Sequence, residues 1–155
     1  MTARLTQITL TDSGDSAPAP EVEQERRVAI FDLLEANHFA LLNGPDGPYS
    51  LRLGLTGSTL GFELAAADGV PAGDFTVTLG ETRQVVKDYA QICANYYDAV
   101  RTQPPFEIEL LDEARRAIHV EGAQSLRTIL AAHVAIDEDT ARRLFTLVCA
   151  LNTGV

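Results

Sequence analysis

The clearest pattern in the chain is a stripe of apolar residues with helical spacing between Glu81 and Thr102. The stripe consists of Val85, Val86, Tyr89, Ile92, Cys93, Tyr96, Tyr97 and Val100. Steps of three and four residues put these side chains on one broad face of an α-helix, and charged or amide side chains occupy most of the other face. Because such an apolar face must be buried against other elements, we expect this helix to lie at the centre of the packing.

Apolar residues alternate with polar or small residues in the segments before this helix, which predicts strands. The alternation over 49–55 and 60–64 surrounds a turn-forming triplet at 56–58, so we expect these segments to form a hairpin. Further strands are expected at 75–79 and 4–10, with a short extended run at 39–42 and a loop at 65–73. The pattern predicts a sheet with one apolar face that helices must cover.

Helical patterns also stand near the two ends of the chain. Pro20 fits the first turn of a helix that should end at about Ala36, with acidic residues near its start. Asp137 is a good N-cap for a closing helix, whose apolar inner face extends to Leu151.

A third helical pattern follows Pro104-Pro105, which must end the 81–102 helix. Its stripe continues past Gly122 to Leu130, so we expect either one long helix or a kinked pair. Together the elements predict one α+β domain over residues 1–155, in which a small antiparallel sheet of about four strands is covered on one face by four or so helices. The C-terminal half is helical, and the Asp, Ser, Gly and Pro residues at 11–19 predict a flexible connection.

Length and charge narrow the possible functions. A chain of 155 residues is long enough for one domain with its own apolar core. Its formal net charge of −10 repels phosphate backbones and anionic lipids, so we expect no binding to nucleic acid or to membranes. Cys93 and Cys149 lie in apolar helical patterns, and there is no leader or membrane-length apolar run. These features predict a protein of the reducing cytoplasm.

Familiar catalytic and cofactor motifs are absent from the sequence. The glycines lack the spacing of dinucleotide-binding and P-loop motifs. His38, His119 and His133 lack the HExxH spacing, and none has a cysteine near it in sequence. We therefore predict neither a metal site nor a cofactor.

One cluster of ionisable residues could carry chemistry. Asp112, Arg115, Arg116 and His119 lie within one or two helical turns of one another. The arginines could hold a carboxylate or phosphate while Asp112 orients His119 for proton transfer. The same spacing is typical of ordinary ion pairs on a solvated helix, which is the interpretation we favour.

Other residues are open to the same two interpretations. Tyr89, Tyr96 and Tyr97 could line a polar pocket near these arginines, although tyrosines of an apolar stripe more often pack in a core. The pairs Arg26-Arg27 and Arg142-Arg143 could bind a partner's carboxylates, but Glu23 and Asp139 are available as local partners.

Four sequence blocks resemble a known family: EVEQERRVAIFDLLEANHFA at 21–40, GPYSLRL at 47–53, RQVVKDYAQICANYYDAVRT at 83–102 and DEDTARRLFTLVCALN at 137–152. They are similar to the uncharacterised UPF0262 family of alphaproteobacteria. The run RRAIHVEG at 115–122 is also similar, with alanine and valine where the family would have glycine and asparagine. The resemblance implies a bacterial cytoplasmic protein and supplies no catalytic residues.

Two hypotheses of function follow. The first is a non-catalytic protein-binding or regulatory module, because the apolar patterns suffice for a core and no catalytic motif is recognised. The alternative is a small enzyme or binding domain for an anionic metabolite, which would use the Arg115, Arg116, His119 and tyrosine patch. Whether the protein is an enzyme and whether it forms homo-oligomers are left open.

Overall fold

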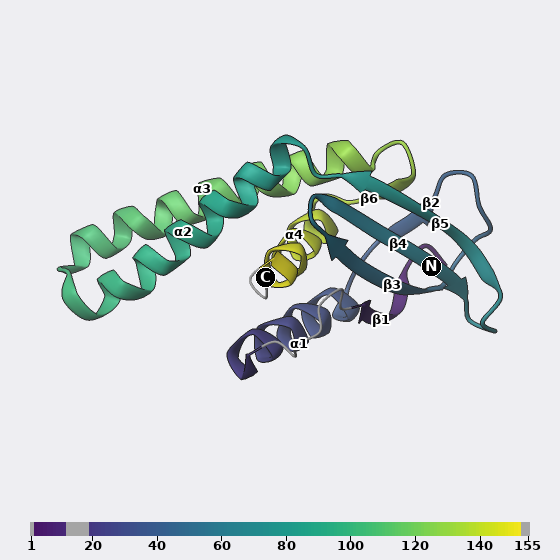
Figure 1. The fold of residues 1–155 in the computed structure, drawn as a ribbon, viewed down its shortest axis with the longest axis horizontal. Coiled ribbons are helices and arrows are strands. Elements are labelled where there is room, and N and C mark those ends of the chain that lie inside the picture. Colours follow the sequence, from purple (N-terminus) through teal and green to yellow (C-terminus); the bar gives the residue numbers. More distant parts are fainter. Residues whose placement is uncertain (1, 12–18, 153–155) are drawn as a thin grey trace.

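A four-stranded sheet occupies one end of the molecule, and a long helical hairpin projects from the other (Figure 1). The computed structural model describes residues 2–11 and 19–152. In chain order the elements are β1 (Leu5–Thr11), α1 (Pro20–Glu35), β2 (Phe39–Leu41), β3 (Tyr49–Thr56), β4 (Thr59–Ala66), β5 (Pro71–Thr78), α2 (Glu81–Thr102), α3 (Pro105–Leu130), β6 (Val134–Ile136) and α4 (Glu138–Asn152). The predicted α+β class and the helical C-terminal half are confirmed.

The larger sheet has the strand order β1-β3-β4-β5. The predicted hairpin is present as β3 and β4, in which Leu53 pairs with Phe62. The loop before β5 is shorter than expected, because β4 extends to Ala66 and β5 begins at Pro71. The sheet is mixed rather than wholly antiparallel, since β1 runs parallel to β3. The short run at 39–42 is β2, which pairs with β6 in a separate two-stranded sheet.

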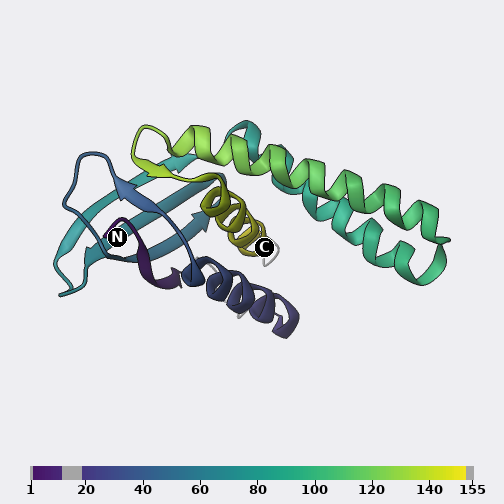
Figure 2. The same ribbon diagram turned by 180° about the vertical axis from the view of Figure 1, so that it is seen from behind.

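The centre of the packing is α4, not α2 as the sequence suggested. Leu144, Phe145, Leu147 and Val148 of α4 have no exposed surface, and this helix lies under the sheet (Figure 2). In α2 only Thr82, Val86 and Ala99 are buried. The apolar stripe of α2 is real, but only its first part, Val85, Val86 and Tyr89, packs on the core, and the rest faces α3 and solvent.

Helix caps follow the sequence closely. Pro20 begins α1, and Asp137 caps α4 by accepting a hydrogen bond from the Thr140 amide at 2.8 Å.

Helix α3 is continuous, so the alternative of a kinked pair is excluded. Residues 12–18 of the predicted flexible connection lie outside the described part of the chain.

Arg26 has a role that its sequence position did not suggest. The residue is only 8% exposed, and its guanidinium donates to the carbonyl oxygens of Ala150 and Leu151, at 3.3 and 3.4 Å. A cation at the C-terminal end of a helix is stabilised by the carbonyl dipoles there. Arg26 therefore joins α1 to the end of α4, whereas Arg27 forms the expected local pair with Glu23 at 3.2 Å.

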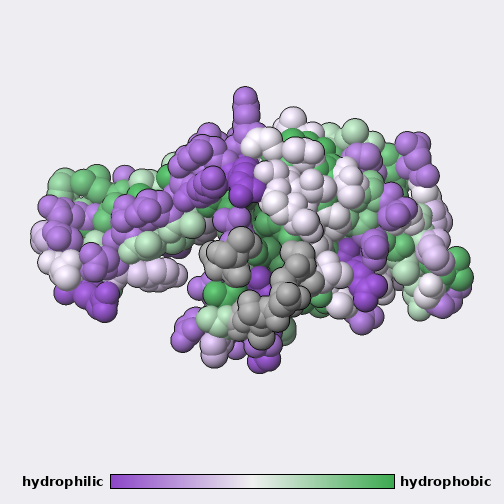
Figure 3. Space-filling view, viewed as in Figure 1, coloured by the Kyte–Doolittle hydropathy of each residue, from purple (hydrophilic) through white to green (hydrophobic). Residues whose placement is uncertain are grey.

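The far end of the α2–α3 hairpin stands clear of the rest of the molecule (Figures 1 and 3). Within residues 94–114, which we call the arm, only Ala99 is buried. No residue between Tyr89 and Ala123 belongs to the apolar core. The arm is therefore held by packing of its two helices on each other.

Gly122 allows α3 to approach α4 closely. A Cβ atom built on Gly122 would meet three ring atoms of Phe145, all within 2.6 Å. Phe145 is fully buried, so its ring has no free space into which it could move. The glycine that the sequence marked as a weak point in the helix is instead a packing contact.

We expect Gly122→Ala to lower the free energy of unfolding by about 1–2 kcal/mol. Alanine favours the helix by about 1 kcal/mol, but forcing a methyl group into a packed core costs typically about 1–3 kcal/mol, and the clash with three ring atoms should fall near the upper end. Urea denaturation measures the change. In a Phe145→Leu background the same substitution should cost less, because the ring is gone. An alanine variant as stable as the parent would contradict this account.

Candidate ligand site at the root of the helical hairpin

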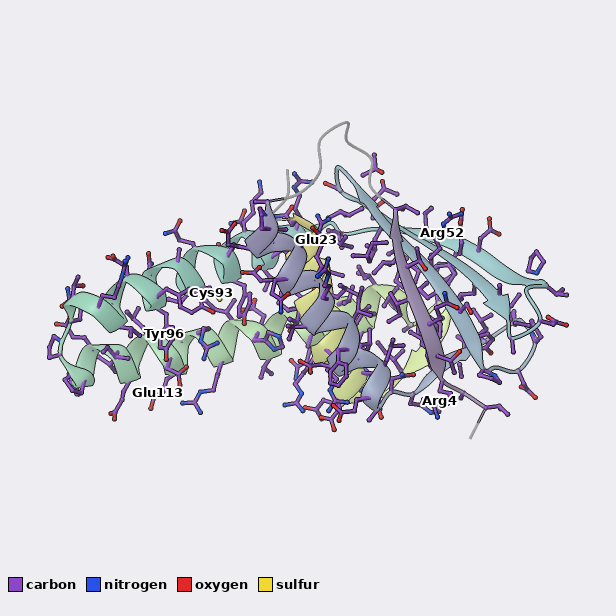
Figure 4. All side chains as sticks on the ribbon, turned by 90° about the horizontal axis from the view of Figure 1, so that it is seen from below. Arg4, Glu23, Arg52, Cys93, Tyr96 and Glu113 are labelled. Carbon is purple, nitrogen blue, oxygen red and sulfur yellow. The ribbon has the colours of Figure 1, made fainter. Side chains whose placement is uncertain are left out.

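The structure brings most of the predicted patch together on α3. Asp112 forms ion pairs with both Arg115 and Arg116, the second at 3.1 Å. The Arg115 guanidinium carbon lies 4.8 Å from the centre of the Tyr96 ring, which is a cation–π contact. Tyr96 lies between α2 and α3, and Glu113 projects from the opposite side of α3 (Figure 4). Tyr97 contacts the Tyr96 ring but is otherwise exposed, so it lies outside the patch.

A hollow of about 300 Å³ opens beside this patch, where α2, α3 and α4 meet. We call it the basic hollow. It is lined by Tyr89, Arg115, Arg116, His119, Val120 and Arg142. Arg142 comes from α4 and Tyr89 from α2. Tyr89 was a candidate pocket residue from the sequence, whereas Arg142 was considered only as a contact for a partner's carboxylates. Sequence spacing could relate residues only within α3, because nothing in it indicates how α4 crosses that helix.

The two aspartates that pair with these arginines do not line the basic hollow. Asp112 holds Arg115 and Arg116, and Asp139 forms a short ion pair with Arg142. Hydrogen bonding from Arg115 keeps the pKa of Asp112 below its usual range, so this carboxylate stays ionised. Each aspartate lies on the same helix as its arginine and orients the guanidinium from outside the hollow.

His119 is held by an aromatic cluster and a hydroxyl group. Its ring centre lies 5.1 Å from that of Tyr89 and 5.3 Å from that of Phe145. Its Nε2 atom is 2.7 Å from Thr146 Oγ1 on α4. Asp112, which the sequence suggested as the partner of His119, pairs with the arginines instead. Burial, followed by the charges of Arg142 and Arg115, holds the pKa of His119 below 6.5, which favours the neutral imidazole at pH 7.

The hydroxyl and thiol groups near the hollow favour their protonated forms. Burial raises the pKa of Tyr89 above its usual value, so the phenol keeps its proton and can donate it in a hydrogen bond. Burial likewise raises the pKa of the Cys93 and Cys149 thiols. A thiol rather than a thiolate is a poor nucleophile, so these groups favour binding and packing over covalent chemistry.

Metal-ligand clusters and membrane-spanning helices are absent from the described residues. In residues 2–11 and 19–152, no three His, Cys, Asp or Glu side chains come close enough to hold a metal ion. Among the helices in the same ranges, none has the length and apolarity needed to cross a membrane.

These features define a small α+β domain with a projecting helical arm and a basic hollow at the root of that arm. The chain belongs to the uncharacterised protein family UPF0262, whose sequence profile matches residues 2–154. It is 49% identical over 156 residues to a UPF0262 protein of Paracoccus denitrificans, covering 97% of this chain and 96% of the relative. A relative in Roseobacter denitrificans is 50% identical over 157 residues, covering 98% and 99%. One in a Jannaschia species is 51% identical over 149 residues, covering 95% and 96%. No solved structure matches.

We expect the environment of His119 to make stability depend on pH. Its pKa is lower in the folded chain than the ordinary value of 6.5, so the unfolded state binds the proton more readily. This contribution to stability is complete above pH 6.5 and is lost as the pH falls towards the pKa of the folded state. Urea denaturation between pH 7.5 and 5 should therefore show a steeper loss for the parent than for His119→Gln.

The exposed His38 provides the matched control for this experiment. The slope of the His38→Gln variant shows how much the loss of a histidine outside the basic hollow changes the pH dependence. Equal slopes for the parent and His119→Gln between pH 6.5 and 5 would show that His119 is not the group responsible.

Proposed function

We propose that this protein is a non-catalytic module that binds another protein through the arm. The observation that carries this proposal is the exposure of large apolar side chains on an element that adds nothing to the core. Those side chains are Tyr97 (65% exposed), Val100 (51%), Phe106 (70%) and Leu110 (50%). Figure 3 shows hydrophobic residues on the arm among hydrophilic ones. A cytoplasmic location, also proposed, is supported by the two free cysteines.

The geometry of the hairpin places these side chains at two levels. The helices reverse direction at Gln103 and Pro104, so residues at equal distances from this turn lie at the same height. Tyr97 is thus level with Leu110, and Val100 lies within one residue of the level of Phe106. Aromatic side chains on a rigid element are typical anchors of protein interfaces, because they bury much area and lose little conformational entropy.

The charge of the arm indicates the chemistry of its partner. Residues 94–114 contain five carboxylates and one arginine, a formal charge of −5 + 1 = −4, from Asp98, Glu107, Glu109, Asp112, Glu113 and Arg101. Two copies of such an arm would repel each other, within a chain whose net charge is already −10. The favoured partner is therefore a different protein, with an apolar groove bordered by basic residues.

The arm variant Tyr97→Ser/Phe106→Ser should lose this partner. Truncating two aromatic anchors that each contribute more than about 1 kcal/mol should weaken binding at least about 10-fold. Tagged protein would be expressed in an alphaproteobacterial host and its co-purifying proteins quantified by mass spectrometry. The affinity for the purified partner would then be measured at low and high salt, and it should fall with salt.

The matched control is Val28→Ser/Phe31→Ser, which removes two exposed apolar side chains from α1. This control should retain the partner, and both variants should keep the parent's melting temperature. Equal recovery of the partner by the arm variant would reject the arm as the binding surface. The absence of any reproducible partner, or a stable homodimer in light scattering, would reject the proposal of a different protein partner.

A further inference from the structure

The basic hollow is lined by positive charge, although the protein as a whole is acidic. The chain carries 22 acidic and 12 basic residues, yet the lining of the hollow includes three arginines and no carboxylate. The three guanidinium groups reach it from two helices, Arg115 and Arg116 from α3 and Arg142 from α4. Asp112 and Asp139 offset part of the repulsion between these arginines from outside the hollow, and an anion inside it would offset the rest.

Donor groups remain available in the hollow after the local ion pairs are counted. A guanidinium has five N–H donors, and a carboxylate engages at most two of them in a bidentate pair. The Arg116 and Arg142 side chains are 69% and 49% exposed, so part of each planar group is open to a ligand. Arg115 is more enclosed, between Asp112 and the Tyr96 ring, and is a fixed positive charge behind them.

The size and walls of the hollow limit what it can hold. A volume of about 300 Å³ is at the small end of ligand sites. The Tyr89 ring and Val120 supply apolar contacts. We propose that the basic hollow binds a small organic dianion, a phosphate monoester or a dicarboxylate, through the guanidinium groups of Arg116 and Arg142.

The charge balance of the site supports a dianion over a monoanion. Three arginines and the two aspartates that pair with them give a net charge of +1 with His119 neutral. His119 faces Tyr89 of α2, Arg115 of its own helix, and Arg142 and Thr146 of α4. A dianion would offset the charges of Arg115 and Arg142, so His119 could take up a proton. The protein groups of the site would then carry a net charge of +2. Binding of the dianion should then raise the pKa of His119.

This inference is independent of the proposed protein partner. It rests on the hollow at the root of the hairpin, whereas the protein-binding proposal rests on apolar side chains at the arm. Either one can fail without the other, and the variants that test them share no residue.

The test uses the full chain and two defined probes, phenyl phosphate for the monoester and succinate for the dicarboxylate. Calorimetry and NMR should give saturable binding of at least one probe below about 10 mM, at constant ionic strength set with sodium chloride. The probe that binds more tightly identifies the head group. In the complex, the NMR titration of the His119 ring should move to higher pH.

Matched substitutions make the result specific. Arg116→Gln/Arg142→Gln should weaken binding at least 10-fold, because both guanidinium groups proposed to bind the anion are lost. Arg101→Gln removes an exposed arginine from the arm and should leave binding unchanged. The proposal is overturned if neither probe saturates, or if the double variant binds as the parent does. It is also overturned if sodium chloride alone reproduces the effect.

Discussion

The contact between Gly122 and the Phe145 ring determines how the helical hairpin sits on the body. Without a Cβ atom at Gly122, α3 can lie directly against a fully buried ring of α4. His119, one turn earlier on α3, packs on the same ring, and Tyr89 of α2 completes the aromatic cluster. The three helices that line the basic hollow are thus brought together by a single close approach. A larger residue at 122 would move all of them, because packed interiors do not yield locally.

The residues that stabilise the fold are separate from the surfaces that we propose for binding. The sheet, α4 and α1 supply the core, and Arg26 satisfies the carbonyl groups at the end of α4. The arm contributes no core residue, so changes to its exposed side chains should leave folding largely intact. Exposed apolar side chains on a protruding element favour aggregation, whereas their burial by a partner is stabilising. Their position on the arm therefore supports the proposed binding role.

Local features of this fold follow from the sequence, and long-range ones do not. Alternation predicted β3 and β4, Asp137 predicted the α4 cap, and helical spacing grouped Asp112 with its arginines. The parallel pairing of β1 was not predictable, because alternation indicates which side chains share a face and not which strand lies beside it. The same is true of the α2 stripe, since an amphipathic pattern predicts that a helix face is buried but not which element packs against it. Arg142 joined the site only through the crossing of α3 and α4.

The position of the basic hollow gives a physical route between the two proposed surfaces. Arg116 belongs to the helix that carries the arm, and Arg142 belongs to the body, so an anion bound by both would link arm and body. Such a ligand favours the orientations of the hairpin in which both guanidinium groups reach the same anion. A partner that binds the arm in one of those orientations would then increase the affinity for the anion, and the anion would increase the affinity for the partner by the same factor. If the hairpin had a single orientation, the two sites would be uncoupled however tightly each ligand bound. Coupling therefore depends on how firmly Phe145 and Gly122 hold α3 in place, and not on the strength of either site.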